Sequence, residues 1–350
     1  MKKAIIFRPG HAIGDAVFIT PLPRLLKADG YEVVDIACQK HNFDVYKNNP
    51  HVDEMIAVPR VEDATKEWND DFQLKLKTYD KIFAASGHVE MGLLHRTDAD
   101  WGTIPSGPDR QEKAKGVSYQ DYIYQQMGLS YTGLLPEFYF DDEEKAQIRA
   151  MQDELRKDKM KLVLWNWTGS SKSKELVYGP MYLQKVLDRH QHSMHYVFSQ
   201  DPNMVSQIPE NPRAFNAWGA STIRNTIMMC SIASLVIGPE SFLVNAAAAF
   251  DTPKMIFFSH SGPENLAKYY KNCMAIVPNK DVMCHPCYLI HCDFRTIFHP
   301  EKRAIAREYE RNCQLATTKF PYRMMGYKCC FFLPHDQIVE NIVKTLKRGK

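Results

Sequence analysis

A carboxylate stands at a glycine-rich turn near the start of the chain, where it could take a proton from a reacting hydroxyl group. Asp15 follows Gly14 in the stretch 8–21, which joins a short apolar run to a segment with helical spacing of leucines. A positioned carboxylate is a general base for attack by a hydroxyl, although Asp at this place is also a good helix N-cap. We expect Asp15 to be the base, with Arg8, His11 and Gly14 on the acceptor side. Arg8 and His11 flank the base and could orient the acceptor, although either could instead serve the local turn.

A second segment has the composition of a phosphate-binding loop. It directly follows the strand-like apolar run 162–165 and contains small residues, hydroxyl groups and two lysines. Backbone amides, hydroxyl groups and cations together suit a diphosphate, although a solvated polar turn often has the same composition. The candidate donor contacts in this loop are Thr168, Gly169, Ser170, Lys172 and Lys174.

Four more candidates follow later strand-like runs. Glu240 and Ser241 precede an alanine-rich helical segment that contains Asn245, and His260 lies in a Ser-His-Ser-Gly-Pro loop. The start of a helix can direct amide groups at a phosphate, and Glu240 could bind a ribose or sugar hydroxyl. We expect all four residues to contact the donor, while a structural role is the alternative for a lone His.

Nine cysteines raise the question of a metal site. Cys284 and Cys287 form a Cys-x-x-Cys pair, with Cys292 and Cys313 further along the chain. Four such ligands can hold zinc in a tetrahedral site. No second Cys-x-x-Cys pair and no His-x-x-x-His pair accompanies them. We therefore favour reduced cysteines in an intracellular protein, with no metal.

Strand-like apolar runs alternate with helical patterns along the whole chain. This alternation is typical of parallel sheets flanked by helices and predicts an α/β fold. Trp165 and Trp167, in and beside one run, are candidates for stacking on a base or sugar, but Trp at such a place is more commonly core. The runs are at 4–7, 33–37, 55–58, 82–85, 162–165, 195–198, 235–237, 255–258 and 274–277.

The composition is that of a soluble enzyme with room for two domains. The 350 residues are 45% hydrophobic and 24% charged, with a net charge of +3, so two cores of ordinary size can form. The near balance of charge gives no general case for nucleic-acid binding, but it leaves a local basic face open. No segment is apolar enough to span a bilayer, and Arg8 interrupts the first apolar run too early for a secretory signal. We expect a cytoplasmic protein.

The N-terminal stretch resembles the signature of glycosyltransferase family 9, the ADP-heptose:lipopolysaccharide heptosyltransferases. A second stretch, 233–253, resembles the donor-site loop and helix of the same family. Two ordered matches this far apart cover most of the chain. The residues that match the N-terminal signature in order are Arg8, Gly14, Asp15, Thr20 and Pro21.

The resemblance implies two facing Rossmann-like domains, the B-type glycosyltransferase fold. Residues 1–150 would form the acceptor-side domain and residues 151–350 the domain that binds a nucleotide-sugar donor such as ADP-heptose. Transfer would be inverting, with Asp15 as base. Because no Asp-x-Asp pair stands at a strand end, we expect no metal and no other cofactor. The expected acceptor is lipopolysaccharide core or another bacterial glycan, and a glycolipid acceptor would bring the enzyme to a membrane surface.

Two departures from the family pattern keep other functions open. Glu240-Ser241-Phe242 and Asn245 stand where the family usually has Asp-Ser-Gly and a His. One alternative is a glycosyltransferase that acts on a hydroxymethylated DNA base, whose activity would fall at high salt. Another is a nucleotide-sugar epimerase, which would form its product from the donor alone. The third is a protein that binds a nucleotide-sugar without turning it over.

Overall fold

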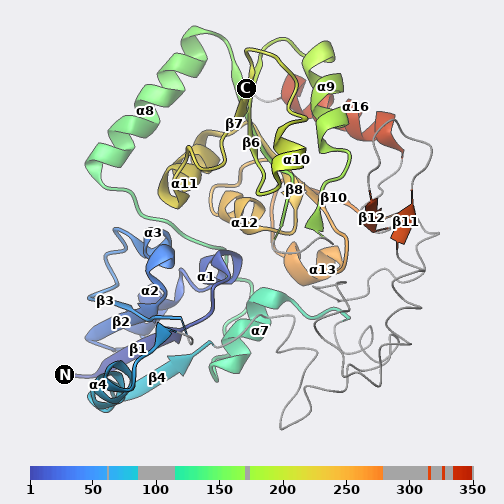
Figure 1. Cartoon of the computed structure of the whole chain (residues 1–350). Helices are drawn as coiled ribbons and strands as arrows, with labels where there is room; N and C mark the ends of the chain where they lie inside the picture. The colour runs from blue at the N-terminus through green and yellow to red at the C-terminus, as the bar shows by residue number, and fades with distance from the viewer. Residues whose placement is uncertain are drawn as a thin grey trace.

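The first part of the chain forms a four-stranded parallel sheet (Figure 1). The structure is a computed structural model that describes residues 1–60, 63–85, 115–169, 174–278, 314–316, 325–327 and 334–348. The strands of the first sheet lie in the order β3 (Met55–Ala57), β2 (Val33–Cys38), β1 (Lys3–Arg8) and β4 (Lys81–Ala84). Central strand β1 is an apolar run because helices and loops cover both of its faces.

The second part of the chain forms a six-stranded sheet, which is also parallel throughout. Its strands lie in the order β10 (Cys273–Ile276), β9 (Lys254–Phe257), β8 (Leu235–Pro239), β5 (Lys161–Asn166), β6 (Ser193–Phe198) and β7 (Ala214–Asn216). A small antiparallel pair is made of β11 (Gln314–Ala316) and β12 (Met325–Tyr327). The expected α/β class is therefore confirmed.

Helices connect the parallel strands of both sheets (Figure 1). Those with the first sheet are α1 (Ile13–Phe18), α2 (Leu22–Ala28), α3 (Phe43–Tyr46), α4 (Lys66–Leu76) and α7 (Tyr119–Gln126). Those with the second sheet are α9 (Gly179–Arg189), α10 (Pro202–Val205), α11 (Ile223–Ile232), α12 (Phe242–Ala248), α13 (Pro263–Leu266) and α16 (His335–Arg348).

Helix α8 (Asp142–Lys157) leads from the first sheet to the second, and residue 150 lies inside it. A capping box fixes its start: the Asp141 side chain accepts from the backbone of Glu144, whose own side chain accepts from the backbone of Asp141. Acidic residues in its first turn and basic residues in its last turn complement the helix dipole. These local signals explain why a largely polar segment is helical.

The cores of the two sheets meet between α1 and α12. One apolar cluster runs from Ala4 and Ile6 in β1, through Val17 in α1, to Val244 and Ala246 in α12, all of them fully buried. Alanines in α12 let the two helices pack closely, and α1 contacts α12 directly. The carboxyl ends of both sheets therefore face one shared space.

A buried histidine in the second sheet makes the fold sensitive to acid. The Trp165 Nε1–H donates to His195 Nδ1 at 3.0 Å, so His195 Nε2–H donates to the Ser193 Oγ at 2.8 Å. Burial, with Arg213 nearby, lowers the pKa of His195 to about 3. Protonation would set an N–H against the indole N–H, so the ring stays neutral when folded.

We expect this histidine to reduce stability as the pH falls. Since the unfolded chain binds a proton near pH 6.5 and the folded one only near pH 3, the loss begins below pH 6.5. At pH 5 it amounts to about 2 kcal/mol. Urea unfolding at pH 7 and pH 5 measures it, with His195→Gln as the comparison. Equal pH dependence in the two proteins would contradict this assignment.

Candidate functional site

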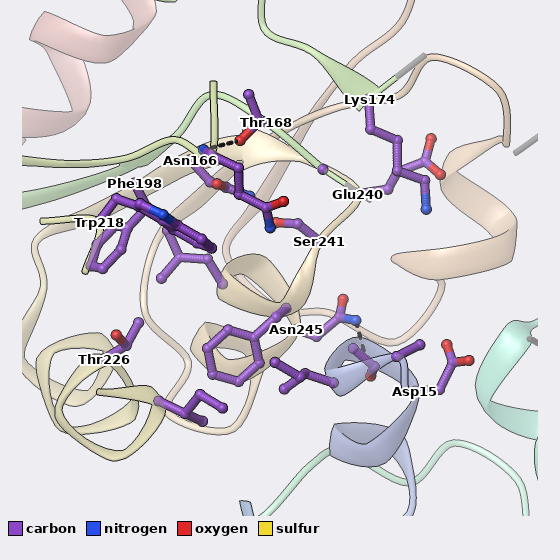
Figure 2. Close-up of a pocket in the computed structure, with 18 of the residues that line it drawn as sticks. Asp15, Asn166, Thr168, Lys174, Phe198, Trp218, Thr226, Glu240, Ser241 and Asn245 are labelled. Atoms are coloured by element: carbon purple, nitrogen blue, oxygen red, sulfur yellow. Dashed lines mark hydrogen bonds between the residues drawn. The ribbon is translucent and has the colours of Figure 1, made fainter. Parts of the chain in front are cut away.

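A cavity of about 620 Å³ lies between the two sheets. It is lined by the turn after β1 and by the loops after β5, β6, β7 and β8. Ligand sites of open α/β sheets lie at the carboxyl ends of the strands, and this cavity has that position in both sheets at once. Figure 2 shows 18 of its lining residues, and the lining comes from elements of both sheets.

Asp15 lies at the cavity, in the first turn of α1. The N-cap of α1 is Ala12, so Asp15 is not the capping residue that the sequence offered as the alternative. Fully buried Arg8 donates from Nη2 to Asp15 Oδ2 at 2.9 Å and from Nη1 to the Ala85 carbonyl at 3.2 Å. A charge-assisted bond of this kind fixes the direction of the carboxylate.

Gly10 makes room for this ion pair. A β-carbon at residue 10 would lie 2.1 Å from the Nη1 atom of Arg8. The loop after β1 can cross the guanidinium only because this position has no side chain. The Gly-rich turn therefore serves the placement of Arg8, and through Arg8 that of Asp15.

The three acceptor-side candidates lie in different places. Gly14 and His11 line the cavity, and exposed His11 stacks against His41 with ring centroids 6.2 Å apart. Arg8 lies beneath the turn and does not line the cavity. Arg8 contacts Asp15 and not the cavity, so any effect of Arg8 on the acceptor would act through the Asp15 carboxylate.

Three donor candidates of the loop after β5 are described, and all three line the cavity. The Thr168 hydroxyl accepts from the backbone amide of Gln200 at 2.8 Å, and this bond joins the loops after β5 and β6. Gly169 lies so close to Lys174 that a β-carbon on it would be 2.4 Å from the Lys174 Cβ. Lys174 brings a positive charge to the cavity. Ser170 and Lys172 lie outside the described residues.

Glu240 lines the cavity and is held by the loop after β9. Its Oε1 accepts from the backbone amides of Ser259 at 3.2 Å and Ser261 at 3.4 Å, and its Oε2 lies 3.2 Å from His260 Nδ1. His260 is fully buried and does not line the cavity. His260 thus contacts Glu240, which stands between it and the cavity.

Ser241 and Asn245 complete the candidates. Both line the cavity at the start of α12. Asn245 is 3% exposed, and its side chain bonds the Gly14 carbonyl and the Tyr270 hydroxyl. The amide therefore links α12 to the turn that carries Asp15.

An aromatic end of the cavity is not predicted by the sequence motifs. Trp218, which is 50% exposed, and Phe198 lie on the opposite side from Lys174 and Asp15 (Figure 2). Asn166 and Thr226 add polar groups among the lining residues. The two tryptophans considered for stacking, Trp165 and Trp167, are fully buried in the core of the second sheet instead.

The cysteine group considered for zinc, Cys284, Cys287, Cys292 and Cys313, lies outside the described residues. Among the described residues, no group of three or more His, Cys, Asp or Glu side chains is arranged to hold a metal ion. A search of the same residues finds no helix long and apolar enough to cross a membrane.

No protein-family profile matches this chain, and no curated protein sequence matches it either. Several solved structures, however, have a similar fold. The glycosyl transferase family 9 structure from Veillonella parvula has a TM-score of 0.61 at 14% identity, over 99% of this chain and 97% of that one. E. coli ADP-heptose lps heptosyltransferase II has a TM-score of 0.56 at 15% identity, over 89% of this chain and 100% of that one.

A third solved structure, E. coli heptosyltransferase WaaC with ADP, has a TM-score of 0.53 at 13% identity, over 89% of this chain and 99% of that one. At identities this low, the similarity establishes the fold alone, and the chemistry must be argued from the residues of the site. The likeness to glycosyltransferase family 9 that the sequence motifs predict is thus confirmed at the level of the fold. The chain has the two-domain α/β architecture of these B-type glycosyltransferases.

Proposed function

We propose that the protein is a glycosyltransferase that moves a sugar from a nucleotide-diphosphate-sugar to an acceptor hydroxyl. The observation that carries this proposal is the division of one cavity into two chemically different sides. Trp218 and Phe198 are on one side, and Lys174 and the oriented carboxylate of Asp15 are on the other (Figure 2). A nucleotide-sugar has the same division into an aromatic base and a reactive sugar phosphate.

The donor would lie across the cavity with its base on the aromatic side. An aromatic ring such as that of Trp218 stacks on a base, and the Asn166 amide and the Thr226 hydroxyl are partners for its polar edge. The diphosphate would then lie near Lys174, and the anomeric carbon of the sugar would lie near Asp15. The cavity volume of about 620 Å³ lies within the usual range of ligand pockets.

Asp15 and Lys174 meet the two chemical requirements of the transfer, which are removal of a proton from the acceptor and stabilisation of the leaving group. As the acceptor oxygen attacks the anomeric carbon, its proton passes to the Asp15 carboxylate. The bond between the anomeric carbon and the diphosphate oxygen breaks, and the nucleoside diphosphate leaves with the electron pair. Lys174 would stabilise the charge on this leaving group. A single displacement of this kind inverts the anomeric configuration, and we propose that it needs no metal or other cofactor.

We propose ADP-heptose as the donor and lipopolysaccharide core or another bacterial glycan as the acceptor. The sequence motifs support this choice, as does the ADP in one similar structure. Residues 1–150 would hold the acceptor and residues 151–350 the donor. The site of action would be the cytoplasm, with contact to a membrane surface where the acceptor is a glycolipid.

A thermal-shift panel with ADP, UDP, GDP, CMP and their sugar conjugates tests the proposal. A ligand at about 100 times its Kd adds roughly 2.7 kcal/mol of stability. We expect one nucleoside diphosphate and its sugar conjugate to raise the melting temperature, ADP first among them. A panel in which no nucleotide shifts the melting temperature would contradict the donor site.

Trp218→Ala is expected to weaken binding of that nucleotide roughly tenfold, because stacking of a base on an aromatic side chain contributes about 1–3 kcal/mol. Titration calorimetry measures the Kd. Phe215→Ala is the matched control, since Phe215 is also exposed, lies on neighbouring β7 and does not line the cavity. Equal Kd values for wild type and Trp218→Ala would remove Trp218 from the site.

A further inference from the structure

We infer that Asn245 and Tyr270 are positioning residues, which hold the turn bearing Asp15 against the donor-side helix α12. The inference rests on the proposed function, because it is sugar transfer that makes the position of Asp15 matter. Asn245 donates from Nδ2 to the Gly14 carbonyl at 3.4 Å, and the Tyr270 hydroxyl donates to Asn245 Oδ1 at 3.0 Å. The chain of bonds runs from the second sheet to the residue before Asp15.

The chemistry of the three groups fixes their direction. The Gly14 carbonyl can only accept, so the amide NH2 of Asn245 must face it. The amide oxygen then faces Tyr270, whose hydroxyl must donate. Burial raises the pKa of Tyr270 well above its ordinary value, which keeps this hydroxyl protonated. Each group has one role, and an Asn at 245 satisfies both neighbours.

Packing makes the link close. A β-carbon on Gly14 would lie 3.3 Å from the Nδ2 atom of Asn245 and 3.7 Å from the backbone nitrogen of Phe242. Gly14 therefore lets α1 approach α12 to within the reach of a short amide. Because Gly14 and Asp15 share a peptide bond, a shift of this turn moves the carboxylate as well.

The turn is also anchored within its own sheet. Arg8 bonds the Asp15 carboxylate at 2.9 Å, and the Tyr46 hydroxyl donates to the Ala16 carbonyl at 3.1 Å. These bonds place Asp15 relative to the first sheet. Asn245 adds a bond from the second sheet, and the distance between base and donor depends on how the two sheets are held together. A misplacement of about 1 Å can cost a hundredfold in rate.

The test compares Tyr270→Phe and Asn245→Leu with wild type in two measurements. The first is release of nucleoside diphosphate from a nucleotide-sugar, with water or glycan as acceptor, read as kcat and donor KM. The second is hydrogen–deuterium exchange of residues 13–18. Tyr182→Phe is the matched control, since it removes a buried hydroxyl that bonds His335 Nδ1 at 2.8 Å and does not line the cavity.

Tyr270 does not line the cavity, so removal of its hydroxyl tests the bond to Asn245 without removing a donor contact. We expect Tyr270→Phe to lower kcat about tenfold with donor KM within about twofold, and to raise exchange in residues 13–18. Asn245→Leu should do the same more strongly, and Tyr182→Phe should do neither. A raised donor KM in Asn245→Leu, with kcat and exchange unchanged in Tyr270→Phe, would overturn the inference and make Asn245 a direct donor contact.

The exchange measurement separates this inference from the proposed function. If wild type releases no nucleoside diphosphate from any donor, the proposed function fails on that result. Exchange in residues 13–18 then decides the link by itself: faster exchange in Tyr270→Phe supports it, and unchanged exchange overturns it.

Discussion

Replacement of Asp15 by Asn is expected to lower sugar transfer by about a hundredfold or more and to leave nucleotide binding nearly intact. The Asn side chain has the same shape and its oxygen can still accept from Arg8 Nη2, which lies 2.9 Å from the carboxylate in wild type. It cannot, however, take up the proton of the acceptor hydroxyl. The loss should therefore fall on kcat, with donor KM little changed.

The measurement is steady-state release of nucleoside diphosphate, together with the thermal shift that the same nucleotide produces. Asp53→Asn serves as the control, because Asp53 bonds Lys27 on the surface and does not line the cavity. Normal turnover in Asp15→Asn would remove this carboxylate from the mechanism. Loss of the thermal shift in Asp15→Asn would instead make Asp15 a binding residue.

Arg224→Met is expected to lower the free energy of unfolding by about 3 kcal/mol. Arg224 in α11 is 4% exposed and forms two bonds with Glu144 of α8, from Nε at 2.8 Å and from Nη2 at 2.6 Å. It also donates to the Asp44 carbonyl of α3 at 3.4 Å and to the Tyr139 carbonyl. One side chain thus joins the second sheet to α8 and to the first sheet.

Glu144 explains the size of this effect. Bonds from Arg224 and Lys47 lower the pKa of Glu144 to about 2, with Arg224 as the largest cause. Without Arg224, the buried Glu144 carboxylate loses its main positive partner. A buried charge left without this partner destabilises the fold more than removal of both Arg224 and Glu144 does. Since the folded pKa lies below that of the unfolded chain, this stability is present above about pH 4.5 and is lost as the pH falls through 2.

Urea unfolding at pH 7 and pH 3.5 measures both effects. The double variant Arg224→Met with Glu144→Gln should recover part of the stability that Arg224→Met loses, because it leaves no buried carboxylate without its main partner, and half-exposed Lys47 stays hydrated. It should also lose less stability than wild type between pH 7 and pH 3.5. A double variant no more stable than Arg224→Met would contradict the account of this ion pair.

The strands and the α/β class follow from local sequence pattern. Buried parallel strands read as apolar runs, and the runs 4–7, 33–37, 162–165 and 235–237 coincide with β1, β2, β5 and β8. Asp15, Thr168 and Glu240 come shortly after β1, β5 and β8, and all three line the cavity. The sequence motifs indicate these residues because each motif follows a strand, and ligands bind at the carboxyl ends of parallel strands.

Contacts between distant segments could not be predicted in the same way. Trp218 follows β7, whose three residues include exposed Phe215, and so short an edge strand has no apolar run to reveal it. The bond between Asn245 and Gly14 joins residues 231 positions apart. Arg224 and Glu144 meet 80 positions apart. Their pairing depends on how the sheets are packed together, which no local pattern encodes.

The departure at residue 245 gains a physical account from these contacts. A side chain that a family pattern assigns to the donor is in this chain satisfied by Gly14 and Tyr270. At residue 240 the carboxylate is likewise engaged by the amides of Ser259 and Ser261. Both departures therefore have hydrogen-bond partners inside the protein.

Proton NMR of the anomeric signal during turnover tests the central claim most directly. The nucleotide-sugar that stabilises the protein is incubated with the enzyme, with and without a glycan acceptor, and spectra are taken before the free sugar can mutarotate. We predict release of the nucleoside diphosphate and a product of inverted anomeric configuration. A product of retained configuration, or an epimerised nucleotide-sugar formed from the donor alone, would contradict transfer by a single displacement with Asp15 as base.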